Sequence, residues 1–280
     1  MVRGNLEKFA VSGLQKAYQI LEELGLAGEE KIQKNQFGET ALRADIEAEE
    51  VVIDVLNAAH IPIRIISEEH GIVDIGEEPA FLAILDGLDG SNVYATQRKQ
   101  GRYGTMLAIF SNVDPVYDDY LFSGVMIHSP RQELFYSQKG RGCFLHLSGE
   151  SRRIRCSNTK TLIENTKIYI DEYFEVNRDQ FSRRLIGFDT KSAYSSAVHY
   201  TDVAVGSADA ALECTRKQNL EIAVAFGLIS EAGGAMVTLD GVSLGRKLYR
   251  TFGQDEHIPV VTASTAELAS SIINHINAYA

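Results

Sequence analysis

Apolar positions along the chain follow two different spacings, and the N-terminal half shows both. Residues 6–24 and 44–59 place apolar side chains three or four positions apart, with acidic residues opposite them in the second stretch, which predicts two amphipathic helices. Short apolar runs then predict strands at residues 63–66, 80–85, 104–110, 121–128 and 133–138. The N-terminal half is therefore predicted to place two helices beside a sheet.

The pattern changes near residue 150, where a basic stretch begins. Further strands are predicted at 167–171, 209–213, 235–239 and 258–262, and helices at 177–186, 195–205, 220–232 and the C-terminus. Because strands and helices come in runs rather than in strict alternation, we expect an α/β (α+β) protein of layered sheets and helices. Residues 1–150 are predicted to form an N-terminal α+β subdomain and residues 151–280 a C-terminal α/β subdomain.

Charge and composition narrow the classes of partner. Acidic residues outnumber basic ones by 38 to 27, and the formal net charge of −11 argues against binding to nucleic acid or to an anionic membrane. Three scattered cysteines without a CxxC motif indicate a reducing compartment. Residues 1–10 are too polar for a signal peptide and no apolar run is long enough to cross a membrane, so we expect a soluble, cytoplasmic protein.

The most informative segment is residues 86–92, Asp-Gly-Leu-Asp-Gly-Ser-Asn, which follows an apolar strand. Asp86 and Asp89 cannot both remain buried and ionised without a cation, because desolvation and mutual repulsion oppose it. The following Gly-Ser-Asn can open a helix whose free N–H groups accept a phosphate. The alternative interpretation is a polar turn, since all these residue types are common in turns.

Other acidic residues also stand at the ends of predicted elements. Glu68 and Glu69 follow a strand, whereas Asp45 and Glu221 lie in the first turns of helices. Taken singly, the glutamate pair is compatible with an exposed loop, and the two helical acids with caps or partners of the helix dipole. Taken together, acids at several element ends predict a site for a hard divalent cation such as Mg²⁺ or Mn²⁺.

Four motifs in this order resemble the inositol monophosphatase family. They are Glu-Glu at 68–69, Asp-x-x-Asp-Gly-Ser at 86–91, Val-Gly-Ser-Ala-Asp-Ala at 205–210 with Glu213, and Glu-Ala-Gly-Gly at 231–234. The family belongs to a wider group with fructose-1,6-bisphosphatases and bisphosphate nucleotidases. The resemblance implies a layered α-β-α-β-α sandwich of the sugar phosphatase type. It also implies a homodimer that hydrolyses a small polyol or sugar phosphate with Mg²⁺.

The resemblance also implies a set of metal ligands. Glu68, Asp86 and the backbone carbonyl of Leu88 would hold a first ion. Asp86 and Asp89 would hold a second ion together with Glu221. Two or three Mg²⁺ ions are expected in total, with Mn²⁺ as an alternative. Paired ions of this kind neutralise charge and activate water in phosphomonoester hydrolysis.

Catalytic and substrate contacts are implied in the same way. Ser91, supported by Asp45, would orient the attacking water, and Glu68 completes the catalytic set. The remaining contacts would be the phosphate-binding amides of Gly90, Ser91 and Asn92, and the substrate-facing side chains of Glu213 and Ser195.

Two departures from the family pattern keep other functions open. Gly87 stands where the family usually has proline, which we expect to loosen the turn between the two aspartates. Glu221 replaces the usual aspartate and lies one residue further from Glu213. Fructose 1,6-bisphosphate and 3′-phosphoadenosine 5′-phosphate are alternative substrates, although residues 89–94 differ from the nucleotidase motif. A non-catalytic ligand-binding or regulatory relative is the alternative of another class.

Overall fold

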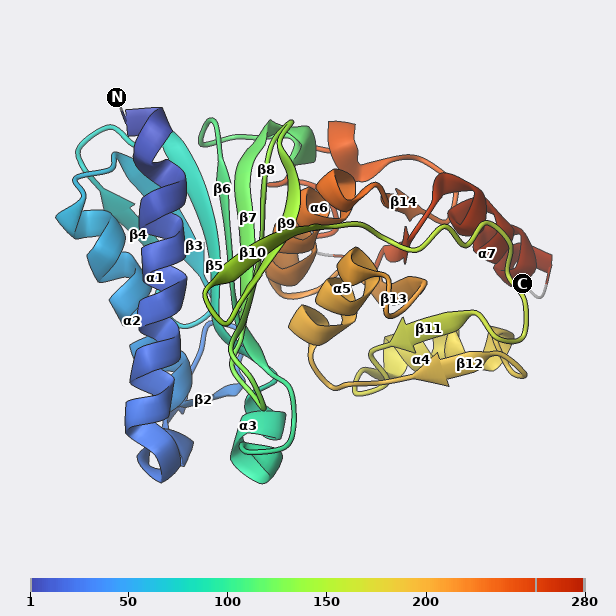
Figure 1. Ribbon diagram of the computed structural model, residues 1–280, viewed down its shortest axis with the longest axis horizontal. Helices are drawn as coiled ribbons and strands as arrows, with labels where there is room; N and C mark the ends of the chain where they lie inside the picture. The colour runs from blue at the N-terminus through green and yellow to red at the C-terminus, as the bar shows by residue number, and fades with distance from the viewer. Residues whose placement is uncertain (1, 255, 279–280) are drawn as a thin grey trace.

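The computed structural model describes residues 2–254 and 256–278, which form five layers in the order α-β-α-β-α (Figure 1). The helices are α1 (Val2–Leu24), α2 (Arg43–Ala58), α3 (Ser91–Gln97), α4 (Glu175–Gln180), α5 (Ser196–Val205), α6 (Leu220–Ala232) and α7 (Ala266–Ala278). Short 3₁₀ helices are η1 (Gly25–Glu29), η2 (Tyr117–Asp119), η3 (Ser182–Arg184), η4 (Lys217–Asn219) and η5 (Leu244–Arg246).

The larger sheet has eight strands in the order β10-β9-β8-β7-β6-β5-β3-β4. They are β3 (Ile63–Ser67), β4 (Gly71–Ile75), β5 (Phe81–Asp89), β6 (Gly104–Phe110), β7 (Tyr120–Ile127), β8 (Glu133–Gln138), β9 (Gly142–Leu147) and β10 (Glu150–Ile154). All neighbours are antiparallel except β3 and β5, which run parallel. A separate hairpin joins β1 (Lys31–Lys34) to β2 (Thr40–Leu42).

Strand β5 is buried along its whole length because both faces of the large sheet are covered. Ala83 and Leu85 pack with residues of α1 and α2, whereas Leu82 and Ile84 pack with residues of α5 and α6. Successive side chains of a strand point to opposite faces, so a continuous apolar run is what such a central strand requires. This strand carries both aspartates at its C-terminal end.

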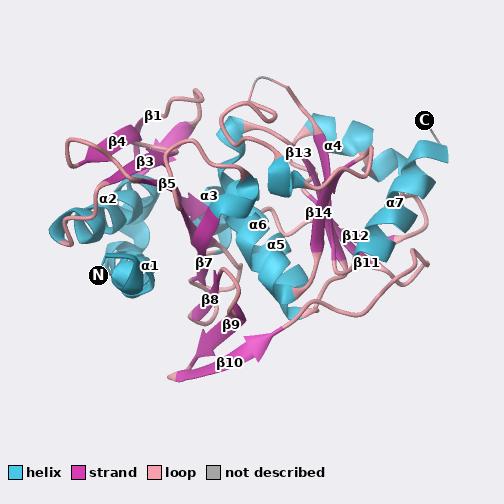
Figure 2. Cartoon of the chain, turned by 90° about the horizontal axis from the view of Figure 1, so that it is seen from above, coloured by secondary structure: helices cyan, strands magenta, loops and turns pink. Residues whose placement is uncertain are grey.

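The smaller sheet has five strands in the order β12-β11-β13-β15-β14. They are β11 (Lys167–Ile170), β12 (Asp189–Lys191), β13 (Ala210–Cys214), β14 (Ala235–Thr238) and β15 (Pro259–Ala263). Helices α5 and α6 lie between the two sheets, and α4 and α7 cover the outer face of the smaller one (Figure 2). The predicted α-β-α-β-α arrangement is therefore confirmed.

Several elements differ from the sequence prediction. The helix predicted at 177–186 is broken, since α4 ends at Gln180 and η3 follows. The strands β1 and β10 had no apolar run to mark them, because four of the five residues of β10 and all of β1 are exposed. Strand β10 ends the large sheet beyond the proposed boundary at residue 150, and the division into subdomains remains a prediction. No helix of the described residues is long and apolar enough to cross a membrane.

Candidate active site

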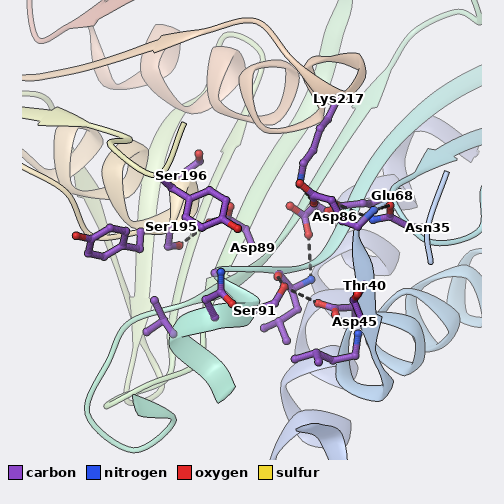
Figure 3. A pocket seen from close by; sticks show the side chains of 18 of the residues that line it. Asn35, Thr40, Asp45, Glu68, Asp86, Asp89, Ser91, Ser195, Ser196 and Lys217 are labelled. Atoms are coloured by element: carbon purple, nitrogen blue, oxygen red, sulfur yellow. Dashed lines mark hydrogen bonds and ion pairs between the residues drawn. The ribbon is translucent and has the colours of Figure 1, made fainter. Parts of the chain in front are cut away.

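A cavity of about 660 Å³ opens at the C-terminal end of β5, between the large sheet and the second half of the chain (Figure 3). Its lining includes most of the residues predicted for the site. They are Asp45, Glu68, Asp86, Leu88, Asp89, Gly90, Ser91, Asn92, Ser195 and Glu221. The fold thus collects in one place acids that lie as far apart in sequence as Asp45 and Glu221.

Three of these carboxylates form a compact group. Asp86, Asp89 and Glu221 each offer an oxygen, and these oxygens all lie within 4.8 Å of one another. All three residues are at least nine-tenths buried. The register between β5 and β6 shifts between Asp86 and Asp89. The one-methylene-longer side chain of Glu221 still reaches this group, so its donor atoms fit a hard divalent cation.

The electrostatics of the group reflect burial and mutual repulsion. Burial raises the pKa of Asp86 well above its usual value, and the charges of Glu68, Asp89 and Glu221 add to the shift. Burial also raises the pKa of Asp89 to about 6, with Glu221 as the next cause. Burial acts in the same direction on Glu221, but Arg216 and Lys217 outweigh it and lower the pKa of that carboxyl. The two cationic side chains therefore favour the ionised form of Glu221, whereas the pKa values of both aspartates stay raised.

Asp45 and Ser91 form a direct pair at the floor of the cavity. The Ser91 hydroxyl lies 2.9 Å from Oδ1 of Asp45 and 3.0 Å from the carbonyl oxygen of Leu88, so it donates to one of them. The other carboxylate oxygen of Asp45 accepts a 2.6 Å hydrogen bond from the amide of Leu42. Burial raises the pKa of Asp45 well above its usual value. The pairing expected from the resemblance is present in the geometry.

Gly90 makes the sharp turn from β5 into α3. Its φ of 90° lies in the left-handed region, and a Cβ there would stand 3.0 Å from the Cβ of Ser195. Only glycine combines that backbone conformation with so close an approach. Ser195 in turn donates its hydroxyl hydrogen to Oδ2 of Asp89, and the amide of Ala197 donates to the same oxygen at 2.7 Å. The start of α5 therefore positions Asp89.

The structure explains why residue 87 is glycine, and it differs from our expectation that this segment is loosened. A Cβ at this position would lie 2.5 Å from the carbonyl oxygen of Asp45 and 2.7 Å from Cγ of Glu49. The carbonyl oxygen of Gly87 accepts a 2.7 Å hydrogen bond from the hydroxyl of Thr105. The same hydroxyl accepts from Nε2 of His128 at 2.8 Å. This part of β5 is therefore held tightly, by the packing of α2 on one side and a hydrogen-bonded chain on the other.

Glu49 supports the segment that carries the glutamate pair. Its fully buried carboxylate accepts hydrogen bonds from the backbone amides of Glu68, Glu69 and His70, at 2.9 to 3.2 Å, and contacts Nδ1 of His70 at 2.8 Å. One side chain of α2 thus fixes the backbone on which Glu68 stands. The sequence offered no signal for this role, because Glu49 looks like one of several acids on a helix.

Glu213 is not brought into the cavity lining formed by the described residues. Its buried carboxylate accepts a hydrogen bond from Tyr200 and lies 3.7 Å from a guanidinium nitrogen of Arg216. Arg216 lines the cavity instead and bonds Glu221 at 2.8 Å and Asp171 at 3.1 Å. Its guanidinium lies 4.1 Å from the centre of the Phe174 ring.

Arg216 and Lys217 are the functional candidates that the sequence analysis missed. The ammonium of Lys217 lies 2.9 Å from Oε1 of Glu68 and also pairs with Glu39. Asn35 donates to both glutamates of the pair, at 3.4 Å to Glu68 and 3.1 Å to Glu69. The available signal was a pair of basic residues shortly before an acid in an otherwise acidic chain.

Comparisons with known proteins agree with the motif resemblance. The sequence profile of the inositol monophosphatase family matches residues 4–278. The chain is similar to the bifunctional NADP phosphatase/NAD kinase of Methanocaldococcus jannaschii, at 25% identity over 240 residues, 76% of this chain and 40% of that protein. It is also similar to the inositol-1-monophosphatase of Aeropyrum pernix, at 27% identity over 258 residues and 88% of each chain.

The chain spans about two fifths of the length of the bifunctional relative. Among solved structures it is similar to the extragenic suppressor protein suhB of Bartonella henselae, with a TM-score of 0.77 over 96% of this chain and 97% of that one. At 19% identity this likeness shows the fold. The family and fold predicted from the sequence are therefore confirmed. The family is one of phosphatases, which also confirms the predicted enzyme class, a phosphoric monoester hydrolase.

Proposed function

Because this chain belongs to the inositol monophosphatase family, we propose that it is a Mg²⁺-dependent phosphomonoesterase acting on a small polyol or sugar phosphate. The observation that carries this proposal is the group of three buried carboxylates from Asp86, Asp89 and Glu221. Such a group is stable in its ionised form only beside a cation, and the same cation would meet the charge of a phosphate. Oxygen ligands of this type suit Mg²⁺ or Mn²⁺.

Asp86, Asp89 and Glu221 would hold the metal, with Glu68 and the carbonyl of Leu88 as further ligands implied by the family resemblance. When bound, divalent ions neutralise phosphate charge and make water more acidic. The proposed need for two or three ions rests on the resemblance, and the described donor atoms support at least one.

The residues of the chain itself would position the reactants. The hydroxyl proton of Ser91 is engaged by Asp45 or the carbonyl of Leu88, so its lone pairs are free to accept a hydrogen bond from a water in the cavity. This arrangement supports the proposed role of the pair in directing the attacking water. The amides of Gly90, Ser91 and Asn92, at the start of α3, would bind the phosphate.

The test is release of inorganic phosphate with and without Mg²⁺. The substrates are inositol 1-phosphate, fructose 1,6-bisphosphate, 3′-phosphoadenosine 5′-phosphate and NADP, and an Asp89→Asn variant controls for contaminating phosphatases. We expect metal-dependent release from a polyol or sugar phosphate, abolished by the variant. Equal release by both proteins, or no release by a folded wild-type chain, would contradict the proposal. The second outcome would favour the non-catalytic relative.

A nucleotide phosphate is the second candidate substrate. Tyr173 and Tyr194 line the cavity with side chains that are 59% and 56% exposed, and exposed rings at a cavity mouth can stack on a base. The relative named as an NADP phosphatase supports the same substrate. We expect Tyr194→Ala to raise KM for NADP and leave KM for inositol 1-phosphate unchanged if the nucleotide is the substrate.

The proposed homodimer, the cytoplasmic location and the substrate-facing roles of Glu213 and Ser195 remain predictions. The position of Glu213 behind Arg216 makes Arg216 the nearer candidate for a substrate contact. Size-exclusion chromatography with light scattering measures the oligomeric state directly, and a mass of one chain would contradict the dimer.

A further inference from the structure

We infer that Lys217 is a built-in cation at the Glu68 carboxylate, where it competes with a metal ion for that ligand. The inference rests on the proposed function, which includes Glu68 among the metal ligands. The Lys217 ammonium lies 2.9 Å from Oε1 of Glu68, and the two side chains are only 17% and 13% exposed. Figure 3 shows Lys217 reaching from the opposite wall toward Glu68 and Asp86.

The surroundings of Glu68 explain why a cation is needed there. Asp86, Glu221 and Glu49 are neighbouring acids, and ionised carboxylates buried together repel one another unless positive charge is added. The Asn35 amide donates to the same Glu68 oxygen at 3.4 Å, which leaves the ammonium as the charged partner. Glu68 is outside the described group of close carboxylate oxygens formed by Asp86, Asp89 and Glu221.

The backbone holds Lys217 in this place. Lys217, Gln218 and Asn219 have φ angles of 44°, 59° and 56°, so three successive residues other than glycine adopt the left-handed conformation. Such strain persists only where the surroundings determine the conformation. The fully buried Asn219 side chain accepts from the amide of Arg216 at 3.0 Å and donates to the carbonyl oxygen of Phe252.

Glu39 completes the setting of the ammonium. It lies in the loop between β1 and β2 and forms a second ion pair with Lys217. The ammonium therefore bridges the β1–β2 hairpin and the end of β3. A metal ion that uses Glu68 must displace this ammonium or remain beside its charge.

The consequence is an unequal pair of cation sites. At the carboxylates of Asp86, Asp89 and Glu221, a metal ion would compete with Arg216, which forms an ion pair with Glu221. At Glu68 the ion pair with Lys217 occupies one carboxylate oxygen, Oε1, and places a positive charge beside the other. We therefore expect one tightly bound divalent ion per chain, where the resemblance implies two or three.

The test is a titration of the full chain with Mn²⁺, in which electron paramagnetic resonance counts the free ion. Wild type should bind one Mn²⁺ tightly. Lys217→Met should add a second tight Mn²⁺ or bind Mn²⁺ at least tenfold more tightly. Lys34→Met is the matched control, because Lys34 lines the same cavity on β1 and has no described contact with Glu68, and it should change affinity less than threefold.

A second pair of variants keeps the test decisive if Lys217→Met folds poorly. Glu68→Gln in the wild-type background should change Mn²⁺ affinity less than threefold, because that carboxylate is already paired. In the Lys217→Met background it should abolish the gain. The inference is overturned if folded Lys217→Met binds Mn²⁺ as wild type does, or if Glu68→Gln alone weakens binding tenfold.

The Mn²⁺ titration tests the inference, and the phosphatase assay tests the proposed function, so the two can be contradicted separately. A chain that gains Mn²⁺ on loss of Lys217 but releases no phosphate from any substrate contradicts the proposed function and supports the inference. A chain that releases phosphate and binds two ions tightly with Lys217 in place supports the proposed function and overturns the inference.

Discussion

The Ser91 hydroxyl lies 2.9 Å from Oδ1 of Asp45, although 46 positions separate the two residues. Asp45 uses its other oxygen to accept from the backbone amide of Leu42, at the start of α2. A helix-start role and a site role were the two interpretations of this acid from its sequence position. The structure places both contacts on one side chain, so the helix terminus and the cavity floor are coupled.

This pair predicts non-additive kinetics. Ser91→Ala and Asp45→Asn should each lower kcat for phosphate release about 10²-fold. The first change removes the hydroxyl group that orients the water, and the second removes the carboxylate that orients this hydroxyl group. The double variant should be only a few-fold worse than the single ones, since both remove the same interaction. Steady-state kinetics on the preferred substrate measure the cycle. Losses that multiply would show that the two residues act independently.

Gly87 predicts a stability effect. Gly87→Ala should lower the free energy of unfolding by about 1–3 kcal/mol, because the added methyl group meets the Asp45 carbonyl oxygen at 2.5 Å. Chemical denaturation of the metal-free protein measures it. Gly13→Ala is the control, since its nearest contact is 3.3 Å, to Cγ1 of Val52 on the neighbouring helix. A Gly87→Ala variant as stable as wild type would show that α2 moves away freely.

The buried His128 predicts a loss of stability in acid. Burial lowers its pKa to about 3, whereas an unfolded histidine titrates at about 6.5. Between these pH values the unfolded state binds more protons than the folded state. The contribution of neutral His128 to the free energy of unfolding is therefore fully present above about pH 6.5 and is lost as pH falls toward 3. At pH 5 the loss is about 2 kcal/mol. His128→Gln should therefore have a shallower dependence of unfolding free energy on pH between 7 and 5, and an unchanged slope would rule this out.

Metal removal predicts a change in thermal stability. Saturating Mg²⁺ should raise the unfolding temperature of the chelator-treated protein, because ions that bind only the folded state stabilise it, by about 2.7 kcal/mol at 100 times Kd. Asp89→Asn should abolish most of this shift, since it removes one oxygen ligand from the group with Asp86 and Glu221. Glu78→Gln removes an exposed acid and is the control. Calorimetry with and without Mg²⁺ decides, and equal shifts in all three proteins would indicate non-specific ion binding.

The acids of the site could be predicted because each has a local signal. Asp86 and Asp89 come after the predicted apolar strand and lie in the last part of β5, Glu68 follows β3, and Glu221 lies in the first turn of an apolar helix. Acids at the ends of buried elements converge on a cleft in layered folds, which made the cation site predictable. Their order in the chain also carried the resemblance to a family.

The two cations of the site could not be predicted in the same way. Arg216 and Lys217 stand just before α6, where three left-handed residues other than glycine turn the chain, and no composition rule marks such a turn. The role of Glu49 was equally unpredictable, because its carboxylate accepts hydrogen bonds from three backbone amides of a segment distant in sequence.

The sequence by itself determined the buried strands and most of the long helices, the layered class and the acidic chemistry of the cavity, because periodicity, turn residues and charge are properties of short segments. Tertiary structure decided which carboxylates meet, that Glu213 lies behind Arg216, and that Lys217 pairs with Glu68 across 149 positions. The physical reason is that the energy of an ion pair depends on distance and burial. Both are set only when the two sheets and the helices between them have packed.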